Sequence, residues 1–233
     1  MLYGEREVRD NIRNREGKRV FYLGKGDQLT SSARDFLTRE RISILPAEQA
    51  KQARCALLTG GYVEGKPEHL THLNGDVLVS KTHPRIVFRG EMDKLEAILM
   101  LCQLNTGAQW EKPLGEILGL ARKIIRCDVM EEPLTQEKLC GLTEQEQRLH
   151  SHRPQEFYGQ AHFMPEVADG AAVLWLNWAR TAARAAELAA IRAWSDRDGN
   201  LIREDIPRTL NRMSSMLYIL MIRAKKENIH GIH

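Results

Sequence analysis

Three charged side chains in an alanine-rich stretch of the chain lie at helical spacing. Arg180, Arg184 and Glu187 follow an i, i+4, i+7 pattern, which places them on one face of a helix. One interpretation is a solvent-exposed face carrying an Arg–Glu pair. The other is an anion site, because the neighbouring faces carry tryptophans and alanines that predict packing on most sides. Two arginines in such surroundings need a carboxylate from another helix or a phosphate.

A second polar line lies in the last helical stretch of the chain. Asn211, Ser214, Ser215 and Tyr218 keep helical spacing beside an apolar stripe, which fits either a water-exposed face or the wall of a site. Asp93 is a third candidate site residue. A carboxylate in the first turn of a helix is favoured by the helix dipole, and it could equally reach an arginine on another helix. For each of these side chains both alternatives stay open at this point.

Two further patterns resemble known functional motifs but lack residues that those motifs need. Gly60 to Lys66 has the spacing of a P-loop, but Pro67 stands where that motif needs Ser or Thr for magnesium and a free amide to begin a helix. A flexible glycine turn is the preferred interpretation. His69 and His72 would share a face only in a helix, and the cysteines form no Cys-x-x-Cys pair. We therefore predict no protein-bound metal, and cysteines that serve as small apolar groups.

Composition limits the class of protein that must position these residues. The chain has 233 residues, of which 42% are hydrophobic, enough for a buried core. The formal net charge is only +3, which disfavours nucleic acid as a partner. The longest apolar run, Met216 to Ile222, is too short to span a membrane, and the polar N-terminus lacks a secretory signal. We expect a cytoplasmic protein that binds neither membrane nor nucleic acid.

The sequence pattern changes near residue 65, from short strand-like and turn segments to long helical periods, which predicts two domains. Residues 1–65 indicate a small, partly flexible α/β appendage, with a basic helix-compatible arm at Arg9 to Arg19 followed by two short strands and a helix. Residues 66–233 show long helical periods. The expected helices lie at about 91–107, 113–129, 143–150, 169–193 and from 205 onward. Their apolar stripes must bury one another, so we predict a mainly α protein with an antiparallel four- or five-helix bundle.

Several stretches of the second domain occur in an order known from one enzyme family. They are Lys66 to Leu73, Lys81 to Arg85, Gly90 to Leu95, Met164 to Glu166, Ala179 to Glu187 and Leu210 to Ser215. On these stretches the chain resembles the ATP:cob(I)alamin adenosyltransferases of the propanediol-utilisation type, and among them the ethanolamine-utilisation branch. The Arg-Thr-x-x-Arg-x-x-Glu and Leu-Asn-Arg patterns are together the most specific part of this resemblance.

The resemblance implies an enzyme that binds ATP, Mg²⁺ and cob(I)alamin and transfers the 5′-deoxyadenosyl group to cobalt. Its implied ATP-site residues are Lys81, Arg184, Glu187 and Asn211. Asp93 and Arg180 are implied as an interhelical salt bridge that shapes the site. Co(I) is itself a strong nucleophile, so the protein must align the substrates, stabilise the departing triphosphate and exclude water and the lower axial ligand. Phe163 or a neighbour, His162 or Met164, is expected to perform that exclusion.

Two family features have no counterpart in this sequence. The usual N-terminal Thr-Arg-x-Gly-Asp-x-Gly phosphate loop is not recognisable, so other residues before Leu78 are expected to replace it. The His-x11-Cys-Cys-x2-Cys metal motif of some ethanolamine-branch members is also missing, since only Cys55 and no histidine precede His69. This second departure agrees with the expectation of no structural metal.

The resemblance also suggests partners. It implies a trimer or another homo-oligomer, a reductase or flavoprotein that supplies reduced corrinoid, and a B12-dependent lyase such as ethanolamine ammonia-lyase, in association with a bacterial microcompartment. The alternative function, from a different class, is a non-catalytic helical protein that binds nucleotide or corrinoid as a chaperone or scaffold.

Overall fold

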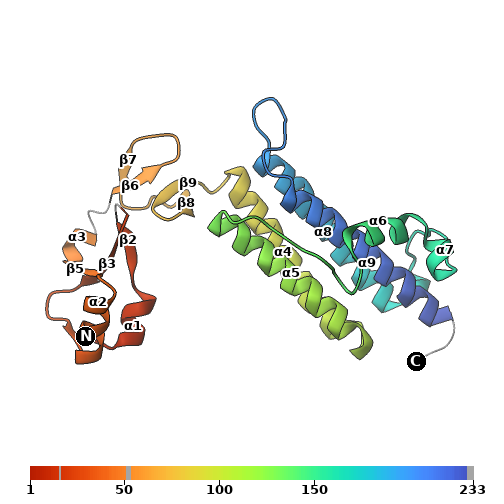
Figure 1. Ribbon diagram of the computed structural model, residues 1–233, viewed down its shortest axis with the longest axis horizontal. Helices are drawn as coiled ribbons and strands as arrows, with labels where there is room; N and C mark the ends of the chain where they lie inside the picture. The colour runs from red at the N-terminus through yellow and green to blue at the C-terminus, as the bar shows by residue number, and fades with distance from the viewer. Residues whose placement is uncertain (16, 51–53, 230–233) are drawn as a thin grey trace. The chain divides into compact units, whose positions relative to one another are not determined.

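The computed structural model describes residues 1–15, 17–50 and 54–229. It contains two compact units, one formed by Met1–Lys81 and the other beginning at Thr82 (Figure 1). The first unit is built mainly from short strands and the second from long helices. The expected combination of a helical bundle with a small α/β part is therefore confirmed.

The first part of the N-terminal unit combines three helices with short strands. Its elements are β1 (Leu2–Tyr3), α1 (Glu5–Asp10), β2 (Arg13–Arg15), β3 (Lys18–Leu23), β4 (Gln28–Leu29), α2 (Ser31–Arg39), β5 (Ser43–Pro46) and α3 (Ala47–Ala50). Thr30 caps α2 by accepting a hydrogen bond from the Ala33 amide. Val8, Phe21 and Phe36 are buried together. The predicted strands at β3 and β5 are confirmed, but the basic arm is not one helix, because its second half pairs with β3 as a strand.

Four more strands complete this unit. They are β6 (Arg54–Leu57), β7 (Tyr62–Glu64), β8 (Leu70–Asn74) and β9 (Val77–Ser80), in the order β7-β6-β9-β8. Gly60 and Gly61, both with positive φ, form the turn between β6 and β7, so the glycine-turn interpretation is confirmed and no helix follows Lys66. The strands β8 and β9 belong to the N-terminal unit, which ends at Lys81. The sequence had instead predicted long helical periods from residue 66 onward.

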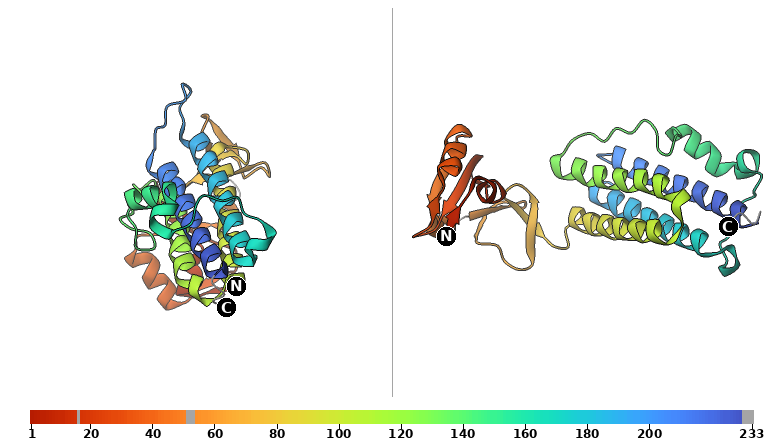
Figure 2. Two further views of the ribbon diagram at one scale, coloured as in Figure 1. Left: turned by 90° about the vertical axis from the view of Figure 1, so that its right-hand side faces the viewer. Right: turned by 90° about the horizontal axis from the view of Figure 1, so that it is seen from below.

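The second unit is a bundle of four long helices. Its elements are α4 (Pro84–Asn105), η1 (Ala108–Trp110), α5 (Glu111–Met130), α6 (Glu144–His152), α7 (Pro154–Tyr158), η2 (Val167–Asp169), α8 (Ala171–Trp194) and α9 (Asp205–Ile229). Figure 2 shows α4, α5, α8 and α9 side by side, with the connection after α5 running along the bundle to α6. One continuous apolar core joins these helices. All four predicted long helices and the short helix near 143–150 are confirmed.

The start of α4 differs from the expectation. We predicted a helix beginning near residue 91, but it begins at Pro84, where proline suits the first helical turn and the His83 ring nitrogen caps the Arg85 amide at 3.2 Å. Asp93 therefore lies well inside the helix. The expectation that its carboxylate interacts with the first turn of a helix is wrong.

No helix within the described ranges is long and apolar enough to cross a membrane.

Candidate active site

The alanines of α8 determine where its arginines can lie. Ala179, Ala183, Ala186 and Ala190 are fully buried and allow α4 and α9 to pack closely against α8. The arginines lie outside the buried alanine stripe, so Arg180 is half-buried and Arg184 is exposed. The helical spacing seen in the sequence thus places both arginines on one face of α8, at the edge of its contact with α9.

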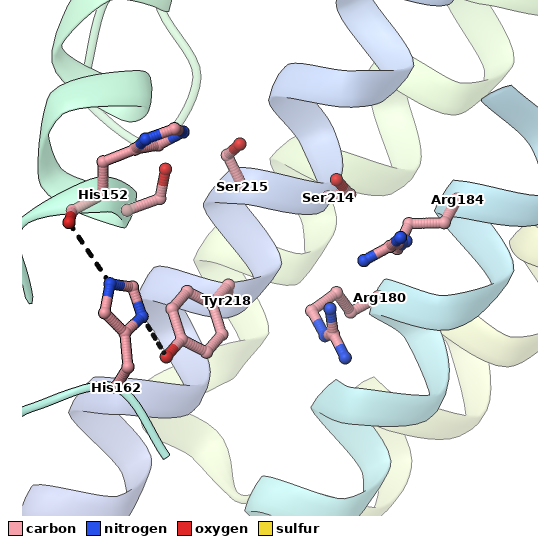
Figure 3. A pocket seen from close by; sticks show the side chains of 8 residues that line it. His152, His162, Arg180, Arg184, Ser214, Ser215 and Tyr218 are labelled. Carbon is pink, nitrogen blue, oxygen red and sulfur yellow. Dashed lines mark hydrogen bonds between the residues drawn. The ribbon is translucent and has the colours of Figure 1, made fainter. Parts of the chain in front are cut away.

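This face borders an open cavity of about 310 Å³ (Figure 3). The cavity is lined almost entirely by hydroxyl, imidazole and guanidinium groups, from Ser151, His152, His162, Arg180, Arg184, Ser214, Ser215 and Tyr218. In Figure 3 the two arginines project from α8 toward the serines and the tyrosine of α9. A cavity with two permanent positive charges in a polar lining suits a polyanion.

Arg180 is held in place by a neutral partner. Its Nε and Nη2 atoms donate hydrogen bonds of 3.2 and 3.0 Å to Oδ1 of Asn177, and its guanidinium lies 6.0 Å from the Tyr218 ring centroid. Burial and the neighbouring Arg184 both lower the pKa of Arg180. Among the described residues, neither arginine forms an ion pair with a carboxylate. The positive charge of the cavity is therefore left uncompensated.

Glu187 and Asn211 meet next to this cavity. Nδ2 of Asn211 donates a 2.9 Å hydrogen bond to Oε1 of Glu187, while Oδ1 of Asn211 accepts one from Arg212. Both ends of the Asn211 amide are thus occupied, which defines its orientation. Its backbone carbonyl also accepts hydrogen bonds from the Ser214 and Ser215 hydroxyls, at 2.9 and 3.2 Å. The structure brings together α8 and α9 residues that the sequence had singled out separately.

Two other predicted site residues, Asp93 and Lys81, are not among the residues that line the cavity. Asp93 is exposed on α4 and forms no ion pair with Arg180 among the described residues, because Arg180 is bonded to Asn177 instead. Lys81 lies at the end of the N-terminal unit, where its Nζ is 2.9 Å from Oε1 of Glu68. A hydrogen bond from Lys81 lowers the pKa of Glu68. The roles of Asp93 and Lys81 stay predictions.

His162 forms the wall of the cavity opposite α8, whereas the sequence had named it only as an alternative to Phe163. His162 bonds through Nδ1 to the Tyr218 hydroxyl at 2.9 Å and through Nε2 to the His152 carbonyl at 3.2 Å. Since a carbonyl only accepts, Nε2 carries a proton, and in this tautomer Nδ1 accepts from the Tyr218 hydroxyl. Phe163, the predicted apolar residue, is half-buried next to Tyr218, with ring centroids 6.2 Å apart. Ser151 and His152 of α6 also line the cavity, and the sequence did not assign them to this site.

The described residues contain no group of three or more histidine, cysteine or acidic side chains arranged to hold a metal ion. Cys102 and Cys127 are buried, and Cys55 and Cys140 are half-buried. Burial raises the pKa of the Cys102 and Cys140 thiols to about 12, so these two side chains stay protonated.

Comparison with known proteins identifies the class of enzyme to which the chain is similar. A family model described as cobalamin adenosyltransferase matches residues 61–224. The chain belongs to the cobalamin adenosyltransferase family.

Individual relatives indicate a branch within this family. The chain is 30% identical, over 238 residues, to "Corrinoid adenosyltransferase EutT" of Salmonella typhimurium, covering 92% of this chain and 89% of the relative. It is 32% identical, over 176 residues, to the protein of the same name from Escherichia coli K12, covering 76% of this chain and 66% of that relative. The resemblance to the ethanolamine-utilisation branch is confirmed.

Proposed function

We propose that the protein transfers the 5′-deoxyadenosyl group of ATP to the cobalt of cob(I)alamin, and that the adenosylcobalamin serves a B12-dependent lyase such as ethanolamine ammonia-lyase. Membership of the cobalamin adenosyltransferase family supports this activity. The structural observation that carries the proposal is the pair Arg180 and Arg184, which face a hydroxyl-lined cavity without a carboxylate partner in the described chain. A triphosphate supplies the missing negative charge.

The protein itself forms no covalent bond in the proposed reaction. The electron pair of Co(I) attacks C5′ of ATP and becomes the Co–C bond, while the C5′–O bond breaks and its own electron pair leaves with the triphosphate. In this proposal Arg184 and Arg180, which line the cavity, stabilise the charge that develops on the leaving group. Alignment of C5′ with cobalt is the remaining task, and it depends on how rigidly the cavity walls are held.

Glu187 and Asn211 form a second part of the proposed nucleotide site. Their shared hydrogen bond leaves a half-buried carboxylate beside the arginine face. Oxygen donors of this kind suit Mg²⁺, which travels with the triphosphate and is held largely by phosphate oxygens and water. We propose that Lys81 adds a further positive charge to the triphosphate, and that Asp93 helps to shape the site.

Phe163 is the proposed apolar group that excludes water and the lower axial ligand from the corrinoid. The side chain is half-buried beside Tyr218, a residue of the cavity wall, which places it next to the proposed nucleotide site. We propose that the adenosyltransferase domain comprises residues 66–233, which include β8 and β9 as well as the helical bundle, with residues 1–65 as an appendage. We further propose a homo-oligomer, a trimer by family resemblance, with a reductase or flavoprotein and a microcompartment as cellular partners.

The visible spectrum of a mixture of the protein, ATP, Mg²⁺ and chemically reduced cobalamin tests this function. The expected result is growth of the spectrum of light-sensitive adenosylcobalamin, and omission of ATP is the control. Binding of ATP or corrinoid without conversion would instead support the alternative of a chaperone or scaffold, which the family relationship does not favour.

A further inference from the structure

The segment 162–169, between α7 and α8, borders the cavity but has little hydrogen-bonded structure of its own. Only its last three residues form a 3₁₀ turn, η2. Met164 and Val167 within it are each 85% exposed. A segment with so little burial needs side-chain contacts at its ends to keep one conformation.

Both ends of this segment are attached to α9. At one end His162 accepts from the Tyr218 hydroxyl at 2.9 Å. At the other end Nζ of Lys225 lies 2.7 Å from Oδ1 of Asp169. Tyr218 and Lys225 lie about two turns apart on the same helix, which separates the two attachments by about 10 Å along its axis.

Lys225 makes two contacts at once. Besides the ion pair, its Nζ lies 4.2 Å from the centroid of the Phe163 ring. The pair is well shielded, with side-chain exposures of 21% for Lys225 and 10% for Asp169, so solvent screens it less than a surface pair. A single ammonium group thus attracts a carboxylate and the face of an aromatic ring from the same segment.

Asp169 transmits this contact to the backbone. Its second oxygen, Oδ2, accepts a 2.9 Å hydrogen bond from the Glu166 amide and closes the η2 turn. Burial would raise the pKa of Asp169, but the hydrogen bonds from Lys225 and Glu166 lower it below its usual value. The carboxylate therefore stays ionised and fastens the turn to α9.

We infer that Lys225 is a positioning residue that holds Phe163 and the 162–169 segment against α9, in the place where they meet the corrinoid. This inference rests on the proposed function, because Phe163 acts there on the corrinoid and not on ATP. Loss of the Lys225 contacts is expected to weaken the use of corrinoid while leaving the use of ATP intact.

Kinetics of Lys225→Ala test this inference. We expect kcat/KM for cob(I)alamin to fall about tenfold, as for a small misplacement of a group near the reacting atoms, with KM for ATP unchanged within about twofold. The fall should be smaller with cobinamide, which carries no lower nucleotide ligand to exclude. Lys225→Arg should restore activity, since a guanidinium can pair with Asp169 and also lie over Phe163. Arg122→Ala, which removes the interhelical pair with Glu96, is the matched control and should behave as wild type.

Three kinetic outcomes would overturn the inference: an unchanged kcat/KM for cob(I)alamin, an equal loss with cobalamin and cobinamide, or a rise in KM for ATP as large as the loss for corrinoid. Hydrogen exchange supplies a readout that needs no turnover. The Glu166 amide should exchange faster in Lys225→Ala than in wild type, and equal exchange rates would also overturn the inference. A wild-type protein that makes no adenosylcobalamin would contradict the proposed function instead, and the exchange experiment would still test the attachment.

Discussion

Two pairs of arginines in the helical bundle have opposite surroundings. Near the start of α4, Arg85 and Arg89 both bond the carboxylate of Asp128, at 3.1 and 2.7 Å, and that carboxylate is completely buried. Midway along α8, Arg180 and Arg184 border an open cavity and have no acidic partner in the described chain. The residue type is the same, but the first group is neutralised by the protein and the second is not.

The difference separates stability from function. A buried, fully bonded ion group contributes to the folded state as a unit, and removal of one partner leaves an uncompensated charge. Burial and, after it, the neighbouring Arg184 lower the pKa of Arg180, since the two guanidinium groups carry the same charge. Such an arrangement stabilises a bound anion better than it stabilises the empty fold. The predictions below test this division, beginning with the largest effect.

The first prediction concerns the neutralised group. Asp128→Ala should lower the free energy of unfolding by about 3–5 kcal/mol, because Arg85 and Arg89 lose their shared buried partner. Denaturant titration of the variant measures this. The more exposed pair Arg122–Glu96 provides the control, since Arg122→Ala should cost no more than about 1 kcal/mol. A loss for Asp128→Ala as small as that of the control would contradict the division.

The second prediction concerns the cavity. Arg184→Ala should lower turnover on the order of 10² or more at saturating ATP, as for removal of other groups that stabilise a developing negative charge. Its unfolding free energy should change by less than about 0.5 kcal/mol, because the side chain is exposed. Arg192→Ala, at an exposed position near the end of α8, is the control and should keep full turnover. Unchanged turnover in Arg184→Ala would remove this residue from the mechanism.

The third prediction concerns Asp93, where we expect an effect of intermediate size. Its carboxylate is exposed and unpaired with Arg180 in the described chain, so Asp93→Asn should leave the unfolding free energy nearly unchanged. If Asp93 shapes the active site as proposed, turnover should nevertheless fall. A double-mutant cycle with Arg180→Ala measures whether the two side chains interact during catalysis, and a coupling energy near zero would argue that they do not.

A smaller effect is expected from pH at the start of α4. Burial, with Arg85 and Arg89 nearby, lowers the pKa of His83 below its usual 6.5, and the ring must be neutral for Nδ1 to cap the Arg85 amide. The unfolded chain therefore binds the proton more readily. The stability that His83 contributes is complete above about pH 6.5 and is lost as pH falls toward its folded-state pKa. Urea titrations across this range should show a slope that His83→Ala abolishes, and an identical pH profile in both proteins would refute the capping role.

The smallest expected effect is that of metal removal. Dialysis against a strong chelator followed by Mg²⁺ alone should restore full turnover, because no group of side chains in the described ranges is arranged to hold a metal ion. Elemental analysis of the purified protein should find negligible zinc and iron. Stoichiometric zinc, or rescue only by zinc or iron, would show that the protein contains a metal site that this prediction omits.

Periodic features of the sequence were enough to predict much of the bundle. The apolar stripes of α5, α8 and α9 repeat at helical spacing over several turns, so local pattern and burial agree. Short elements were harder. The second half of the basic arm forms β2 only because β3 provides a partner strand, and β8 and β9 likewise depend on pairing with each other. Strand pairing joins residues that no local pattern connects.

The candidate site divides in the same way. Local spacing by itself determined that Arg180, Arg184 and Glu187 share one face of α8, and that Ser214, Ser215 and Tyr218 line a neighbouring stripe of α9. Only the tertiary structure decided that these two stripes meet, that Asn177 and not Asp93 holds Arg180, and that His162 closes the cavity. The physical reason is that helix periodicity is a property of neighbouring residues, whereas the partner of each charge depends on which helices pack together and how the connecting segments run.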